Sequence, residues 1–165
     1  MSLKPKLQLV LLLILFVACG FFRDFLFVNV DEQSRIAYYH DTDSHLAHSL
    51  KFLERFSYYS LYYIKWILTL FFSLLFMGLS LLIIRVFYGS VNYTRWTLFA
   101  YAALFILAAL FFCGGYLINH WERGYIFARF LMGIAQGPIP LMVLLTGFRI
   151  QKFSRDATGN QRDHA

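Results

Sequence analysis

Charge is scarce in this sequence: Asp, Glu, Lys and Arg together make up 15% of its 165 residues, too few for an ordinary soluble domain. Cysteine is also rare. Cys19 and Cys113 both lie inside apolar runs, so neither a CxxC redox motif nor a disulfide framework is indicated. The net charge is +6, but the basic residues are neither clustered nor interleaved with exposed aromatic residues. This distribution argues against nucleic acid as a partner.

The abundant residues are apolar and aromatic, at 59% and 20% of the chain, and they stand in long blocks. About 20 such residues in a helix cross the ~30 Å hydrocarbon core of a bilayer. We therefore expect an all-α integral membrane protein with four transmembrane helices and one outer amphipathic helix, in a single domain over 1–153. The predicted spans cover residues 7–28, 64–86, 96–118 and 126–148.

The orientation follows from Lys and Arg, which are retained on the cytoplasmic side near helix ends. With the N-terminus inside, the cytoplasmic segments hold eight Lys and Arg and two acids, a net charge of 8 − 2 = +6, against seven of each sign outside. The short 85–95 hairpin and the two tails are the most informative segments for this orientation. We expect both termini in the cytoplasm and the chain in the inner membrane of a bacterium.

The segment 29–63 is the one large loop that this topology places outside. Asp43 is a plausible N-cap, and Leu46, Leu50 and Leu53 recur at helical spacing, which predicts an amphipathic helix on the outer leaflet. The tail 154–165 lacks apolar residues, and its composition predicts a disordered cytoplasmic extension.

The position of Cys19 allows a second interpretation of the N-terminal segment. Lys4 and Lys6 followed by an apolar run up to Cys19 are similar to a lipoprotein signal peptide. Phe16 stands where such signals usually have leucine, and cleavage would leave a hydrophobic start instead of a polar tether. An uncleaved first span is the favoured interpretation, and a lipidated Cys19 is the alternative.

A His and Asp cluster in the outer loop could hold a metal ion. Its members are His40, Asp41, His45 and His48. Imidazole and carboxylate groups three to four residues apart on a helix can share a metal. The spacing matches no established metal motif, and solvated loop residues explain it more simply, so no metal or other cofactor is expected.

A thiol enzyme is the main catalytic alternative. Cys113, His120 and Arg129 are all predicted near the outer face, where a thiolate activated by imidazole could perform acyl transfer or peptide cleavage. The simpler interpretation, which we favour, is that Cys113 is a small apolar residue in a packed helix. Gly114 and Gly115 after it would allow another helix to approach closely.

Polar residues inside the predicted spans are candidate binding residues because burying them in lipid is costly. Asp24 and Arg129 lie at comparable outer depth on the first and fourth spans, where they either pair or extend to the interface. Gln136 and Pro138 lie within the fourth span, where Pro138 and Pro140 must kink the helix and expose carbonyl groups.

Two stretches, FFRDFLFVNVDEQ at 21–33 and PIPLMVLLTGFRI at 138–150, resemble small multi-spanning membrane proteins associated with bacterial exosortase systems. Exosortases use Cys, Arg and His, and no such catalytic motif accompanies the resemblance. It implies an accessory membrane partner of a sorting or export enzyme. We therefore rank a non-catalytic accessory subunit first, with the bilayer and a membrane protein as its partners, then the thiol enzyme, then a small oligomeric transporter.

Overall fold

The computed structural model describes residues 3–39 and 48–162, which are helical almost throughout and contain no strand. Three helices are long and apolar enough to cross a membrane, and a bent pair of helices counts as a fourth if it forms one span. The all-α membrane fold is therefore confirmed. The elements are α1 (Leu3–Tyr39), the 3-10 helix η1 (His48–Arg55), α2 (Tyr58–Tyr88), α3 (Val91–Leu117), α4 (Trp121–Ala135) and α5 (Ile139–Arg162).

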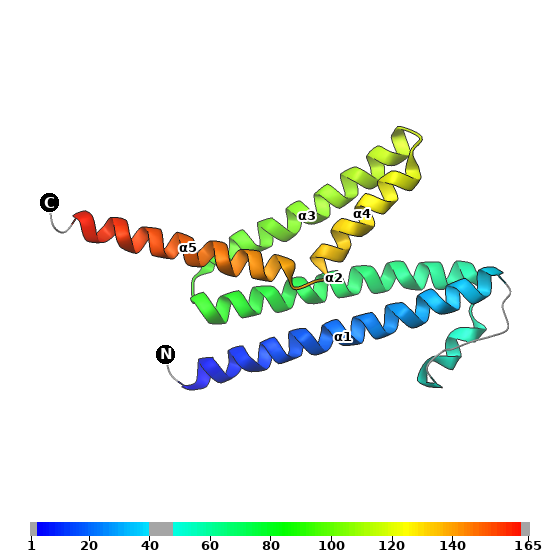
Figure 1. The fold of residues 1–165 in the computed structure, drawn as a ribbon, viewed down its shortest axis with the longest axis horizontal. Coiled ribbons are helices and arrows are strands. Elements are labelled where there is room, and N and C mark those ends of the chain that lie inside the picture. Colours follow the sequence, from blue (N-terminus) through cyan, green and yellow to red (C-terminus); the bar gives the residue numbers. More distant parts are fainter. Residues whose placement is uncertain (1–2, 40–47, 163–165) are drawn as a thin grey trace.

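The helices form two hairpins that meet at one end and diverge at the other (Figure 1). Helices α1 and α2 run antiparallel as one arm, and α3 and α4 form the second arm, which leans away from the first. Helix α5 turns back toward the end of the molecule where α1 begins. The start of α1 and the end of α5 therefore lie at the same end, which we call the terminal end; the opposite end is the open end.

The terminal end contains the main core of the bundle. Phe16 of α1 packs edge-on against Phe76 of α2, with ring centroids 4.9 Å apart, and both rings are buried. Ser80 and Tyr101 share a fully buried hydrogen bond of 2.8 Å that joins α2 to α3. Tyr88 donates to the Leu145 carbonyl at 2.8 Å and so ties α2 to α5. Satisfied polar contacts of this kind fix helix positions where all surroundings are apolar.

Helix α1 continues well past residue 28, the predicted end of the first span, and reaches Tyr39. The extension is polar in composition, but its inward face is buried, with Val30 2% and Gln33 5% exposed. Leu50 and Leu53 of η1 pack with Val30 and Leu61 to form a small second core. Part of the predicted outer loop is thus helical because these contacts stabilise it. Residues 40–47 lie outside the described residues.

The second half of the predicted amphipathic helix lies within the described residues, where it forms η1. Its apolar residues Leu50 and Leu53 are 8% and 3% exposed, whereas Lys51, Glu54 and Arg55 are exposed. Leu50 and Leu53 are therefore covered by α1 and α2 of the same chain, whereas Phe52 is 55% exposed.

The fourth predicted span, 126–148, is divided into two helices with a bend of 59° between them. Pro138 has no N–H, and its ring would collide with the carbonyl four residues earlier if α4 continued. The chain instead leaves α4 through Gln136 and Gly137, whose N–H groups donate to Met132 and Ile134 carbonyls. The predicted kink is thus a complete break. Helix α5 then continues to Arg162, past residue 154 where disorder is predicted.

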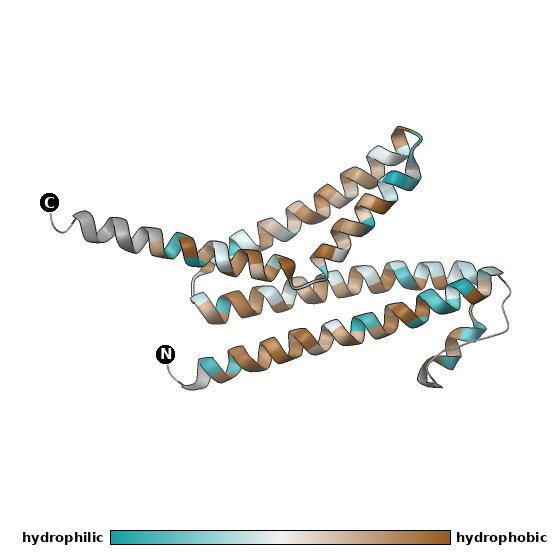
Figure 2. Cartoon of the chain, viewed as in Figure 1, coloured by the Kyte–Doolittle hydropathy of each residue, from teal (hydrophilic) through white to brown (hydrophobic). Residues whose placement is uncertain are grey.

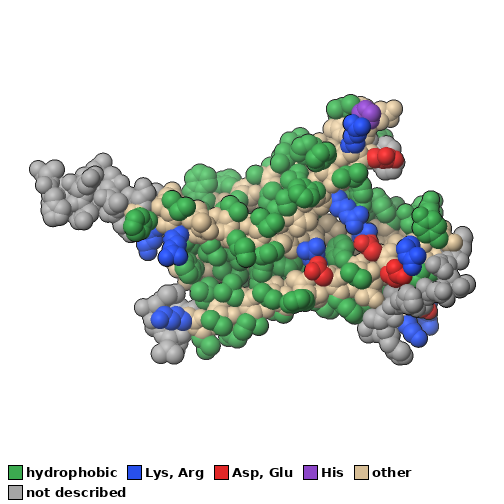
Figure 3. All heavy atoms as spheres, viewed as in Figure 1, with side chains coloured by type: hydrophobic (Ala, Val, Ile, Leu, Met, Phe, Trp, Pro, Cys, Tyr) green, Lys and Arg blue, Asp and Glu red, His purple; other side chains and the backbone are tan. Residues whose placement is uncertain are grey.

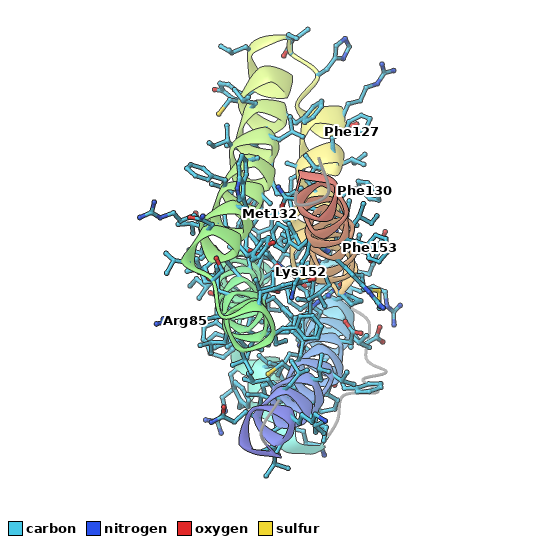
Figure 4. All side chains as sticks on the ribbon, turned by 90° about the vertical axis from the view of Figure 1, so that its left-hand side faces the viewer. Arg85, Phe127, Phe130, Met132, Lys152 and Phe153 are labelled. Carbon is cyan, nitrogen blue, oxygen red and sulfur yellow. The ribbon has the colours of Figure 1, made fainter. Side chains whose placement is uncertain are left out.

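Hydrophobic residues make up the middle of both arms (Figure 2), and their side chains cover much of the face drawn in Figure 3. Exposed phenylalanine and leucine are frequent on α1 and α3, because lipid rather than protein is the solvent for these faces. Charged side chains gather at the terminal end and along the facing sides of the arms toward the open end (Figure 3). At the terminal end, Arg85 projects away from the bundle (Figure 4).

Two glycines allow α3 and α4 to touch. A Cβ atom on Gly115 would lie 2.6 Å from the Gly124 Cα, and one on Gly124 would lie 2.5 Å from the Phe111 carbonyl oxygen. Neither distance is possible for real atoms, so only glycine fits at this crossing. Gly115 thus provides the close helix approach that the sequence suggests, whereas Gly114 faces open space.

We expect Gly124→Ala to lower the free energy of unfolding by about 1–3 kcal/mol, because backbone atoms must shift to admit the methyl group. Gly114→Ala is the matched control. It adds a methyl group to the same hairpin without a contact and improves helix propensity, so its melting temperature should equal or exceed that of the wild type. Thermal unfolding in detergent measures both, and equal effects of the two substitutions would contradict the close contact.

Candidate functional site: a cationic cavity between α1, α2 and α4

A cavity of about 250 Å³ lies where the two arms begin to diverge. We call it the cationic cavity, after the residues that α1, α2 and α4 place around it. They are Arg23, Phe27 and Asp31 from α1, Tyr62, Lys65, Trp66 and Thr69 from α2, and Tyr125, Ala128, Arg129, Met132, Gly133 and Gln136 from the end of the second arm.

Gln136 forms the floor of this cavity and anchors the break between α4 and α5. Its side chain is 4% exposed, and its amide donates to the Thr69 carbonyl at 2.8 Å and to the Ser73 hydroxyl at 2.9 Å. Ser73 in turn donates to the Thr69 carbonyl at 2.7 Å. A buried amide in an apolar bundle is stable only when its donors are satisfied. Gln136 therefore fixes the end of α4 against the middle of α2.

Arg23 reaches the same point from α1. One terminal nitrogen of its guanidinium donates to the Gln136 carbonyl at 3.1 Å. Its Nε is buried and has no hydrogen-bond partner, although the Asp24 carboxylate lies 3.5 Å from it. The cation also lies 5.8 Å from the centre of the Phe27 ring. Arg23 thus satisfies the Gln136 carbonyl at the helix break, and its Nε remains a donor without an acceptor.

Asp31 connects the two arms through two cations. Lys65 of α2 donates to one carboxylate oxygen, and Arg129 of α4 lies 3.7 Å from the other. The Lys65 side chain is 20% exposed, but that of Arg129 is 56% exposed, so water and counterions reach this second pair. Exposed ion pairs contribute at most about 1 kcal/mol. The Arg129 contact is therefore easily exchanged for another anion.

The charges lining the cavity do not balance. Arg23, Lys65 and Arg129 contribute three positive charges against the one negative charge of Asp31. Asp24, close to Arg23, is 67% exposed and does not line the cavity. The lining residues therefore carry an excess charge of 3 − 1 = +2, and counting Asp24, the ion-pair partner of Arg23, lowers it to 3 − 2 = +1. Water screens part of this charge, because Arg129 and Asp31 are about half exposed.

Asp24 and Arg129, which the sequence allows either to pair or to extend to the interface, do not pair with each other. Arg129 pairs with Asp31 rather than with Asp24, which lies beside its own neighbour Arg23. Asp31 is two helical turns further along α1, and the sequence placed it in a loop because the helix was expected to end at residue 28. Pro138 belongs to the break itself and does not line the cavity.

Two of the other candidates, Cys113 and His120, do not line the cavity. Cys113 is exposed on α3, and His120 immediately precedes α4. His40, Asp41 and His45 lie outside the described residues, as does the side chain of His48. Elsewhere in residues 3–39 and 48–162, no group of three or more His, Cys, Asp or Glu could hold a metal.

Lys65, Thr69 and Asp31 are the site residues that sequence reasoning missed. A signal for two of them exists, because Lys65 and Thr69 are four residues apart and so share one face of α2. Asp31 could be found only after extending α1 beyond its apolar part.

Comparison with protein-family models, curated proteins and solved structures gives no match for this chain. The chemistry of the cationic cavity is therefore the basis for assigning a function.

Replacing Gln136 by Leu should destabilise the protein by about 1–3 kcal/mol, since the Ser73 and Thr69 partners lose a buried donor. Gln151→Leu, at an exposed position of α5, provides the control and should change the melting temperature little. Thermal unfolding of both variants in the same detergent tests the anchor. A Gln136→Leu protein as stable as the control would show that the break does not depend on these bonds.

Proposed function

We propose that this protein is a non-catalytic accessory subunit of a membrane complex and that it supplies a binding site for an anionic group. The observation that carries the proposal is the cationic cavity, which is lined by three cations and one carboxylate. An excess of cations within a membrane protein is costly unless a ligand or partner neutralises it.

The lining residues favour binding over catalysis. They include neither cysteine nor histidine, and the Thr69 hydroxyl already donates to the Lys65 carbonyl at 2.8 Å. Cys113, the nucleophile of the thiol-enzyme alternative, is not among them. A fixed set of Arg and Lys donors is suited to holding an anion in place.

The packing also argues against a transporter built from one chain. A transport path must continue through the terminal end of the bundle, where Phe16, Phe72 and Phe76 are buried between α1 and α2. Gln136 closes the cavity on that side with bonds to α2.

The proposed placement has the terminal end in the cytoplasm of a bacterial cell and the cavity in the outer half of the inner membrane. It is supported by the charge asymmetry of the short loops and tails, and by the common position of the two chain ends (Figure 1). The sequence resemblance to exosortase-associated proteins makes protein sorting or export the proposed task of the complex.

Reporter fusions test the placement. We expect fusions after Lys152 and within residues 85–95 to be active as cytoplasmic reporters, and a fusion at Ser57, before α2, to be active only as an exported one. A cytoplasmic result at Ser57 would reverse the orientation and place the cavity in the inner leaflet.

The function is tested by complementing a deletion strain and measuring its exported proteins by quantitative mass spectrometry. Arg23→Gln with Arg129→Gln should fail to restore the wild-type set, because the cavity loses two cations. Cys113→Ala and His120→Ala should restore it. Arg85→Gln is the matched charge control, since this exposed arginine lies at the terminal end.

For each strain, the membrane abundance of the protein and its migration on a native gel are also measured. An unchanged set of exported proteins in the deletion strain would contradict the sorting or export role. Failure of Cys113→Ala at normal abundance would instead establish the thiol enzyme. Migration of the wild-type chain alone would contradict its role as a subunit.

A further inference from the structure

The cationic cavity continues into two other hollows of the surface, and together they have the character of an amphiphile site. Toward the open end it shares Tyr62, Lys65, Tyr125 and Arg129 with a recess of about 680 Å³ that Tyr58 and Tyr116 also line. Tyrosines of this kind are typical of the headgroup zone of a membrane.

On the other side of α4 lies an apolar groove of about 600 Å³. It is lined by Ile126, Phe130, Ile134 and Ile139, and it extends from the middle of α4 to the start of α5. Ile126 and Phe130 are 63% and 65% exposed, as expected for side chains that face lipid. Figure 4 shows Phe130 of the groove and Met132 of the cavity on different sides of α4.

Gly133 joins the cavity to this groove, because it lines both. A Cβ atom at Gly133 would have no neighbour within 4 Å, so the missing side chain leaves a low point on the surface of α4. Arg129, one turn earlier, also lines both hollows. A ligand can therefore cross α4 at Gly133 with its charged end held by Arg129.

We propose that the occupant is a membrane lipid with a phosphate monoester head group, which lies in the cationic cavity while its chain follows the apolar groove. This inference rests on the proposed function and names its ligand. The excess of positive charge favours an anionic head group, and a phosphate monoester carries about −1.5 to −2 at pH 7 and has three strong acceptor oxygens for the Arg and Lys donors. The buried Nε of Arg23 is a donor that these oxygens can satisfy.

The size of the cavity agrees with a head group. Pockets for whole drug-sized ligands measure about 300–1,000 Å³. The cavity, at about 250 Å³, is slightly smaller, and the apolar groove offers the remaining space outside it. A free anion would fill the cavity but would leave the groove without a role.

Native mass spectrometry of the full chain in detergent tests this proposal with dioleoyl phosphatidic acid as the probe. Dioleoylglycerol has the same chains without phosphate, and inorganic phosphate supplies the anion without chains. Phosphatidic acid should bind at least tenfold more tightly than either. Arg129→Gln should weaken it about tenfold, the usual cost of one charge-assisted hydrogen bond.

Gly133→Leu should weaken the binding of phosphatidic acid about tenfold without lowering the melting temperature, because its Cβ atom meets no neighbour within 4 Å and the rest of the side chain occupies the crossing point. Two control variants should bind as the wild type does. Gly147→Leu makes the same change at an exposed glycine of α5 that also faces open space, and Arg85→Gln removes a distant charge.

Equal binding of dioleoylglycerol would overturn the role of the cations. Displacement of phosphatidic acid by an equal concentration of inorganic phosphate would show a free-anion site and overturn the lipid assignment. If Gly133→Leu bound phosphatidic acid with the affinity of the wild type, the groove would not be the site of the lipid chain. These outcomes concern the purified chain, so they are distinguishable from failure of the proposed function, which is measured by complementation in cells.

Discussion

The structure depends on the bonds that Gln136 makes at the end of α4. A helix that stops inside a membrane leaves carbonyl groups without partners, and lipid cannot satisfy them. Here the Gln136 side chain bonds to α2, and its carbonyl accepts from Arg23 of α1 at 3.1 Å. One residue thus joins three helices at the point where the two arms diverge. Without it, Pro138 would leave a break with no defined position.

The cationic cavity follows from this anchor. Because α4 ends against the middle of α2, its preceding turns carry Arg129 and Gly133 past Lys65 and Asp31. The close contact between Gly115 and Gly124 lets α4 pack against α3 in the second arm. Because the arms diverge, Arg129 is 56% exposed, whereas Arg23 lies deeper and its Nε is buried.

The two ends of the molecule are built for different tasks. At the terminal end, aromatic packing and the Ser80 to Tyr101 hydrogen bond leave little space between helices. The open end also has a small core around Val30 and Leu61, but there half-exposed ion pairs and tyrosine-lined recesses lie beside it. Half-exposed ion pairs are weak contacts that a ligand can exchange.

The sequence by itself determined the membrane class, the apolar segments and the disruption of the last span, because length, hydropathy and the missing N–H of proline act locally. It also identified Arg129 and Gln136 as residues too polar for lipid. The tertiary structure alone decided their partners. The extension of α1 to Tyr39 is stabilised by burial of Val30 against η1 and α2, and it is this extension that presents Asp31 to Arg129. Contacts between residues far apart in the chain have no local signature, so the cavity could not be derived from hydropathy or spacing.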